Sequence, residues 1–207
     1  MIDARLPELP PGAFAKQDIG DDLAFYAPPR LVTHLDEGAV AALTAHYRKQ
    51  LPDGGRVLDL MSSWVSHLPT EHEYAVVGHG MNAEELAANP RLDRWFVQNL
   101  NRETALPLED RSFGATLCCV GVQYLQQPLA VFAEVRRVLT PGAPFIVSFS
   151  NRCFPTKAIA IWRALGSDGH AALVRLYLER TGFAQITALI LANGQGSDPL
   201  IAVTGRA

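Results

Sequence analysis

The stretch that decides the fold is LPLEDRSFGATLCCVGVQYLQQPLAVFAEVRRVLTPGAPFIVSFSN, residues 106–151. Within it, residues 112–125 are an apolar run that predicts a strand leading into a short loop. Residues 128–139 have the spacing of an amphipathic helix that starts at Pro128 and stops before the turn signal TPGAP. Residues 144–150 are again almost wholly apolar. The stretch therefore predicts strand, helix and strand, the repeating unit of a parallel sheet.

The same alternation continues on both sides of this stretch. The first 35 residues are rich in proline and predict an irregular arm. The last two strands have no helix between them, so we expect an antiparallel strand at the edge of the sheet. The sequence thus predicts one doubly wound, Rossmann-like α/β domain over residues 1–207, with an N-terminal arm and helix (1–50) packed on a core fold (51–207). The other expected elements are helices at 33–52, 82–90, 155–166 and 168–183, and strands at 56–60, 73–80, 94–101, 184–192 and 199–205.

Composition narrows the classes of partner. The chain is 48% hydrophobic and 19% charged, with a formal net charge of −3. It has no long basic run, so we expect neither a nucleic-acid nor a membrane partner. Its beginning has no apolar core, which argues against a signal peptide, and we expect a cytoplasmic protein. Cys118, Cys119 and Cys153 are too few and too irregular for a disulfide framework.

The order of elements resembles the class I S-adenosylmethionine-dependent methyltransferases, in particular the small-molecule, methyltransferase type 11-like branch. The resemblance covers about residues 36–205. Residues 106–151 are similar to the family's LPF-D-SFD-V segment and its REI-RVL-PGG helix and turn. RVLDL (56–60) and AVVGHGMNAEEL (75–86) fall at the first and second strands. The resemblance implies a seven-stranded, mostly parallel sheet and S-adenosylmethionine as cofactor, with S-adenosylhomocysteine as product.

The sequence departs from the family at the cofactor site. MSSWVSHLP (61–69) replaces the glycine-rich turn after the first strand, and Trp64 must point away from the pocket or cover it. Gly80 stands where the family has the acid that holds the ribose hydroxyls. Asn99 replaces the acid that meets the adenine amino group, and Gly114 replaces the aspartate of SFD, the second aspartate of the LPF-D-SFD-V segment. A narrower resemblance, to methyltransferase-like proteins with the same SSWVSHLP loop, indicates that the change belongs to a subfamily.

Asp59 is the one expected acid that remains. At the carboxyl end of the first strand, its carboxylate would orient the serine-rich loop and, through water, the cofactor's ammonium group. The alternative is a carboxylate that caps loop amides. Asn82 has two similar interpretations, as a ribose partner or as the N-cap of the next helix. The full set of predicted cofactor residues is Asp59, Met61, Ser62, Ser63, Gly80, Met81, Asn82, Asn99, Leu100, Asn101 and Val120.

Three residues are candidates for the catalytic role. Tyr124 would orient the substrate or act as a weak acid, unless it is a pocket wall. His67, in the binding loop, could act as general base. Tyr26, in the arm, would close over the site, unless the arm is simply packed there. Gln123 and Arg152 are the predicted substrate residues, since the planar guanidinium of Arg152 suits a carboxylate or phosphate. The alternative for Arg152 is a surface arginine that covers a helix.

The histidines do not form a metal motif. His67 and His72 are five residues apart with no ligand pair nearby, so we predict no metal. Methyl transfer to a small molecule is the first functional hypothesis. The second is a methyltransferase-fold protein that has lost transfer chemistry and acts as a ligand-binding or regulatory subunit. An NAD-type reductase is disfavoured because no G-x-G-x-x-G follows the first strand. Substrate identity and oligomeric state stay open.

Overall fold

The computed structural model describes residues 6–207 and contains a seven-stranded sheet in the order β3-β2-β1-β4-β5-β7-β6. Strands β1 to β5 pair in parallel. Strand β7 is inserted antiparallel between β5 and β6, and the edge strand β6 pairs antiparallel with it. The strands are β1 Arg56–Asp59, β2 Ala75–Gly80, β3 Arg94–Val97, β4 Ala115–Cys119, β5 Pro144–Ser150, β6 Ala184–Ala192 and β7 Leu200–Arg206. The predicted doubly wound, mostly parallel fold is confirmed.

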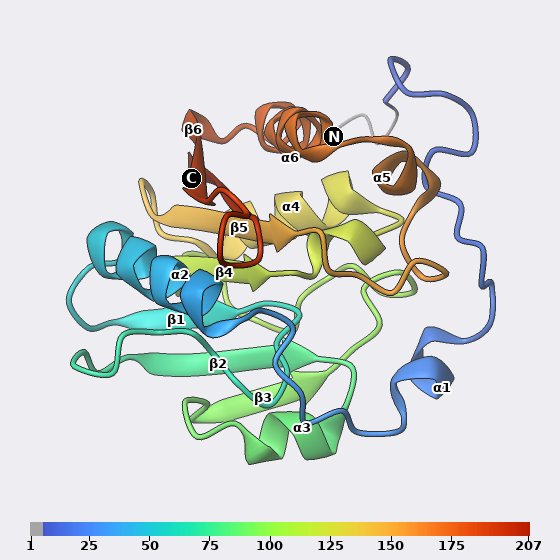
Figure 1. The fold of residues 1–207 in the computed structure, drawn as a ribbon. Helices are drawn as coiled ribbons and strands as arrows, with labels where there is room; N and C mark the ends of the chain where they lie inside the picture. Colours follow the sequence, from blue (N-terminus) through green and yellow to red (C-terminus); the bar gives the residue numbers. More distant parts are fainter. Residues whose placement is uncertain (1–5) are drawn as a thin grey trace.

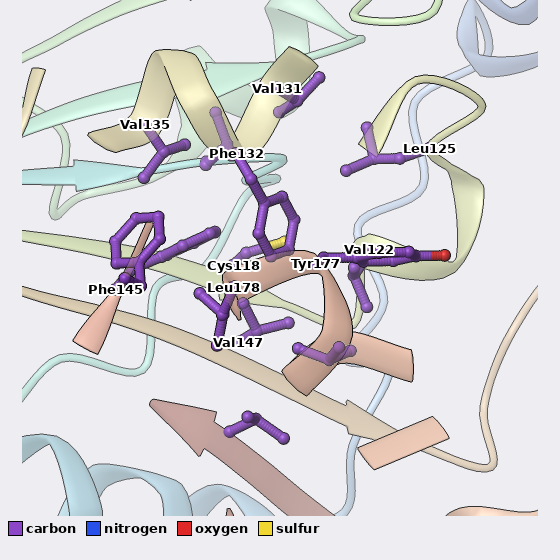
Figure 2. Packing of buried hydrophobic residues seen from close by; sticks show 14 of the residues in the cluster. Cys118, Val122, Leu125, Val131, Phe132, Val135, Phe145, Val147, Tyr177 and Leu178 are labelled. Atoms are coloured by element: carbon purple, nitrogen blue, oxygen red, sulfur yellow. The ribbon is translucent and has the colours of Figure 1, made fainter. Parts of the chain in front are cut away.

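Helices cover both faces of this sheet (Figure 1). On one face, α2 (Glu37–Gln50) places Leu43 and Tyr47 against a cluster that includes Val57, Leu117 and Ile146. On the other face lie α4 (Pro128–Val138) and α6 (Ser167–Arg180). There Phe132 packs edge-on against Phe145, with ring centroids 4.9 Å apart, and against Tyr177 at 5.5 Å (Figure 2). Successive strand residues alternate between the two clusters, because side chains of a strand point to opposite faces.

The elements differ from prediction at three places. The arm, expected to be irregular, contains a short helix, α1 (Asp22–Tyr26), whose N-cap Asp21 accepts a hydrogen bond from the backbone N–H of Leu23. The helix expected at 155–166 shrinks to α5 (Ala160–Ala164), because the turns before it hold the arm instead. The strand expected at 94–101 ends at Val97. The first five residues of the predicted arm lie outside the described residues.

The connection between β1 and β2 has no helix. A parallel crossover normally carries one, but residues 60–74 form turns and extended chain only. The remaining short elements are α3 (Ala83–Ala88), after β2, and the 3-10 turn Val122–Tyr124, after β4. The arm runs outside the carboxyl ends of the strands before it reaches α2 (Figure 1). The site is therefore enclosed by this connection and the arm.

Candidate cofactor and substrate site

A cavity of about 550 Å³ lies at the carboxyl ends of β1, β2 and β4. Its size is that of a site for a cofactor or a drug-sized molecule. Among the residues that line it are Tyr26, Asp59, Met61, Ser62, Ser63, His67, Gly80, Met81, Asn82, Asn99, Leu100, Asn101, Val120, Tyr124 and Arg152. These are all of the predicted site residues except Gln123. The structure thus brings the predicted residues together around one space.

Asp59 lines this cavity and is almost fully buried, with 5% of its surface exposed. Its carboxylate accepts hydrogen bonds from the hydroxyls of Ser62, at 2.7 Å, and Ser66. Burial raises the pKa of the Asp59 carboxyl, and the two serines act against that rise. No lysine or arginine forms an ion pair with it within residues 6–207. A buried carboxylate without a cation is costly, and a cationic ligand group would relieve that cost.

His79 fixes the start of the loop that follows Asp59. Its Nδ1 accepts a hydrogen bond from the backbone N–H of Met61 at 3.1 Å, so the ring proton is on Nε2. Nε2 lies 3.0 Å from the carbonyl oxygen of Gln98 and donates to it. The carbonyl of His79 also accepts the N–H of Ser62. Met61 is held at a φ of +58°, a left-handed conformation that non-glycine residues rarely adopt. His79 therefore connects β2, β3 and the loop.

Hydrogen bonds to α3, α2 and the arm hold the rest of the loop. Ser63 donates to Glu85 of α3 at 2.5 Å. The amide of Asn89, at the end of α3, donates to the carbonyl of Ser63 and to the hydroxyl of Ser66. Thr44 of α2 donates to the carbonyl of His67. The indole of Trp64 donates to the carbonyl of Val32 in the arm, so Trp64 lines the cavity and joins the loop to the arm.

Gly80 touches this loop so closely that no other residue fits. A Cβ at position 80 would lie 2.5 Å from the carbonyl oxygen of Ser62. An acid at this position is therefore incompatible with the observed loop. Glu85 is the acid that lines the cavity in this region, although sequence reasoning missed it. Acids are common in the first turn of a helix because they interact favourably with the helix dipole. Glu85 differs from an ordinary first-turn acid only in its hydrogen bonds to Ser63 and to the arm, which the sequence does not show.

The amide residues of the site have structural partners. Asn82 caps α3 through Glu85, and its amide donates to the carbonyls of Tyr26 and Ala27. Asn101 donates to Asp22 and to the carbonyl of Tyr124. The backbone N–H of Asn101 is itself bound by the side chain of Asn99. These side chains shape the cavity and fasten the arm, and their predicted contacts with cofactor stay predictions.

The three predicted catalytic residues, Tyr26, His67 and Tyr124, all line the cavity. The hydroxyl of Tyr124 accepts the backbone N–H of Phe154 at 2.8 Å, and burial raises the pKa of Tyr124 to about 12. Burial also raises the pKa of Tyr26. By contrast, burial lowers the pKa of His67, and neighbouring His34 lowers it further. At neutral pH both tyrosines are therefore protonated, whereas His67 is neutral and able to accept a proton.

The two predicted substrate residues have different positions. Arg152 lines the cavity but donates to Asp198 at 2.8 and 3.0 Å, and 60% of its side chain is exposed. Gln123 lies behind the cavity wall, with 1% exposure, and donates to the carbonyl of Val120. Val120 itself has a φ of +51°, which is rare for a β-branched residue. Strain of this kind is often found at ligand sites.

No group of three or more potential metal ligands occurs in the described part of the chain. No helix in residues 6–207 is long and apolar enough to cross a membrane.

Comparison with known proteins agrees with this architecture. Residues 60–147 match the family model described as methyltransferase domain. No curated protein matches the chain in sequence. Among solved structures, a S-adenosylmethionine-dependent methyltransferase from Mesorhizobium loti is 19% identical, with a TM-score of 0.57 over 80% of this chain and 98% of that one. The [4+2]-cyclase SpnF is 14% identical, with a TM-score of 0.62 over 89% and 90% of the two chains.

A third similar structure is the geranyl diphosphate C-methyltransferase from Streptomyces coelicolor A3(2), with 13% identity and a TM-score of 0.57 over 82% of this chain and 80% of that one. At these identities the structures establish the fold, which is that of the class I methyltransferases. The match of residues 60–147 makes this part of the chain similar to the methyltransferase domain family, in agreement with that fold.

Proposed function

We propose that the protein transfers a methyl group from S-adenosylmethionine to a small-molecule substrate and holds the cofactor with its serine-rich loop. The observation that carries this proposal is the buried carboxylate of Asp59, which faces the cavity without a cation. An ammonium group, such as that of the cofactor's amino-acid end, is its natural partner. The similar enzyme from Streptomyces coelicolor, crystallised with S-adenosylhomocysteine and geranyl diphosphate, supports both the cofactor and a small substrate.

The cavity also offers a replacement for the missing ribose acid. Gly80 cannot carry a carboxylate beneath the Ser62 carbonyl, but Glu85 reaches the cavity from the next helix. Each carboxylate oxygen of Glu85 accepts one protein hydrogen bond, from Ser63 or from the backbone of Arg30. A carboxylate oxygen can accept a second. Glu85 thus has the capacity to bind ribose hydroxyls while it holds the loop.

The sulfonium of S-adenosylmethionine supplies a methyl group that is already activated. The protein therefore has to place the substrate in line with that group and remove a proton where the substrate carries one. His67, neutral at pH 7, is the residue suited to accept that proton. Tyr124 and Tyr26 stay protonated and would orient the substrate by hydrogen bonding or by contact with their rings.

A second function has a specific argument of its own. Three acids expected from the family are replaced, at Gly80, Asn99 and Gly114. The [4+2]-cyclase SpnF has a similar fold, so the fold by itself does not require methyl transfer. On this view the protein binds a ligand in the same cavity and serves as a binding or regulatory subunit.

Calorimetric titration separates the two functions. The wild type, Asp59→Ala and Asp53→Ala are titrated with S-adenosylmethionine and S-adenosylhomocysteine; Asp53 is an exposed acid outside the site. We expect micromolar binding, about −8 kcal/mol, that Asp59→Ala weakens at least tenfold and Asp53→Ala leaves unchanged. Transfer of a labelled methyl group to a small-molecule extract would then establish the enzyme. No heat and no change in melting temperature with either ligand would favour the binding subunit.

A further inference from the structure

The guanidinium group of Arg30 lies within a box of aromatic rings in the arm and the loop after β5. Its central carbon is 4.9 Å from the ring centroid of Phe25, 5.4 Å from that of Phe154 and 5.9 Å from that of Tyr26. The rings also pack edge-on against one another, Phe25 against Tyr26 and against Phe154. Such contacts hold the plane of a guanidinium in a defined position, while the N–H donors at its edge stay available for hydrogen bonds.

Arg30 differs from the other basic residues of the cavity in having no acidic partner. Lys16 is neutralised by Asp22 at 2.7 Å, and Arg152 by Asp198 at 2.8 Å. Within residues 6–207, no carboxylate forms an ion pair with the guanidinium of Arg30.

The hydrogen bonds of Arg30 leave most of its donors unused. Its guanidinium donates to the carbonyls of Phe25, at 3.0 Å, and Pro28, at 3.4 Å. Arginine has five such donors. Glu85 accepts the backbone N–H of Arg30 at 2.7 Å, so this acid fixes the position of residue 30 without pairing with its side chain. The half-buried cation that lines the cavity therefore retains free donors in a fixed fork.

We propose that Arg30 is an anion-binding site in the cavity, and that it takes a carboxylate or phosphate group. A planar guanidinium binds these groups through two parallel hydrogen bonds. The inference rests on the proposed function, which supplies two sources for the anion: the carboxylate of the cofactor's amino-acid end, or an acidic group of the substrate. In either case Arg30, and not the surface-exposed Arg152, selects the anion.

The test uses three ligands and three variants. S-adenosylhomocysteine carries the amino-acid carboxylate, 5′-methylthioadenosine lacks it, and inorganic phosphate probes the site without a nucleoside. Each is titrated into wild type, Arg30→Gln, Arg30→Lys and Arg175→Gln. Arg175→Gln is the control, because it removes an exposed arginine that pairs with Glu179 on α6, outside the cavity. Circular dichroism checks that each variant is folded, and Arg30→Lys takes the place of Arg30→Gln if the latter does not fold.

Two results would support the site and identify its source. If Arg30→Gln weakens S-adenosylhomocysteine at least tenfold but leaves 5′-methylthioadenosine unchanged, Arg30 binds the cofactor's carboxylate. If both nucleosides are unaffected while phosphate binding disappears, the anion belongs to the substrate. Arg30→Lys should retain part of the affinity, since it keeps the charge but loses the fork.

The opposite results are equally clear. Affinities for S-adenosylhomocysteine and phosphate that change less than twofold in Arg30→Gln would overturn the proposal. Equal weakening of both nucleosides with no effect on phosphate would do the same, because it would reveal a purely structural role. Failure of the wild type to bind any nucleoside would count against the proposed methyl transfer, and the phosphate titration would still decide the role of Arg30.

Discussion

A Cβ atom on Gly80 would lie 2.5 Å from the carbonyl oxygen of Ser62. By the resemblance to the class I methyltransferases, position 80 is also where an acid that holds the ribose is expected. The missing acid and the unusual loop are therefore one feature, because the loop occupies the space that a side chain at position 80 would need. This dependence argues against scattered loss of function, since two separate segments of the sequence have to change together.

Restoring a side chain at position 80 should therefore damage the protein. We expect Gly80→Ala to lower the free energy of unfolding by about 1–3 kcal/mol, because the strand end and the loop backbone must move apart. Gly114→Ala is the matched control, since a Cβ there would lie 3.7 Å from the nearest backbone atom, an ordinary contact. Urea unfolding measures both. Equal stability of the two variants would show that the loop can shift without cost.

Glu85 should contribute both to the stability of the loop and to the affinity for the cofactor. Glu85→Gln weakens the charge-assisted hydrogen bonds to Ser63 and to the backbone of Arg30. Such bonds contribute about 1.5–3 kcal/mol, so we expect at least a tenfold loss of S-adenosylhomocysteine affinity together with a lower melting temperature. Glu84→Gln, an exposed acid in the same helical turn, is the control. An unchanged affinity would leave Glu85 a purely structural role.

Much of the fold is predictable because each buried strand is a short apolar run between turn signals. The boundaries of α2 and α4 follow from Asp36 and Pro128 at their starts. The short helix in the arm was missed because five residues carry too little periodicity to recognise. The reduction of the expected helix at 155–166 has a tertiary cause: the backbone of residues 156, 160 and 161 bonds the arm.

The site was predictable by position and not by contact. Residues at the carboxyl ends of parallel strands meet at one edge of the sheet, so Asp59, Gly80 and Val120 could be placed together from sequence. The contributions of Arg30 and Glu85 depend on how the arm and α3 pack over that edge. Gln123 was misleading for a related reason, since its 3-10 turn directs the side chain behind the wall while Tyr124 faces the cavity.

The stability of the protein should depend on pH through His79. Burial lowers the pKa of His79 to about 4, and a proton on Nδ1 would displace the N–H of Met61. The unfolded chain binds that proton at the ordinary histidine pKa near 6.5. The contribution of neutral His79 to the free energy of unfolding is therefore complete above pH 6.5 and is lost as pH falls towards 4. The expected loss is about 2 kcal/mol by pH 5.

Several other histidines also have a lowered pKa and destabilise the protein in the same direction as pH falls. Comparison of wild type with His79→Gln isolates the part that is due to His79. Urea midpoints are measured from pH 7 to pH 5. The difference between the free energies of unfolding of wild type and His79→Gln should shrink as pH falls from 7 to 5. A difference that stays constant with pH would contradict the assignment.

The arm should depend on Lys157 for its attachment. The Lys157 side chain is 1% exposed, and its ammonium group lies 3.1 Å from both Asp18 and Asp22 and donates to the carbonyl of Gly20 at 2.9 Å. Lys157→Met removes one of the two lysines that neutralise the buried Asp22 and leaves only Lys16 there, so we expect the attachment of the arm to weaken. We expect limited proteolysis to cut the arm before the core. Arg175→Met, which removes an exposed pair with Glu179, should change neither stability nor cleavage. If the arm and the core of Lys157→Met were cleaved at the same rate, Lys157 would not be what attaches the arm to the core.

Asp59 should affect stability and binding in opposite directions. Burial raises the pKa of its carboxyl, so the folded protein holds the proton more tightly than the unfolded chain and loses stability as pH rises from 3.8 through the raised pKa. Asp59→Asn removes the buried charge and keeps an oxygen that can accept from Ser62 and Ser66. We expect it to stabilise the free protein by about 1 kcal/mol, as is common when a functional charge is removed.

The same substitution removes the partner of the cofactor's ammonium group, so S-adenosylhomocysteine affinity should fall at least tenfold. Thermal unfolding and calorimetry on one preparation measure both quantities. Parallel loss of stability and affinity would mean that the carboxylate mainly organises the loop. A gain in stability with unchanged affinity would show that the cofactor does not contact this acid. Only a gain in stability together with a loss of affinity fits the proposed role of Asp59. In that role the buried carboxylate destabilises the free protein, and the ligand supplies the cation that it lacks.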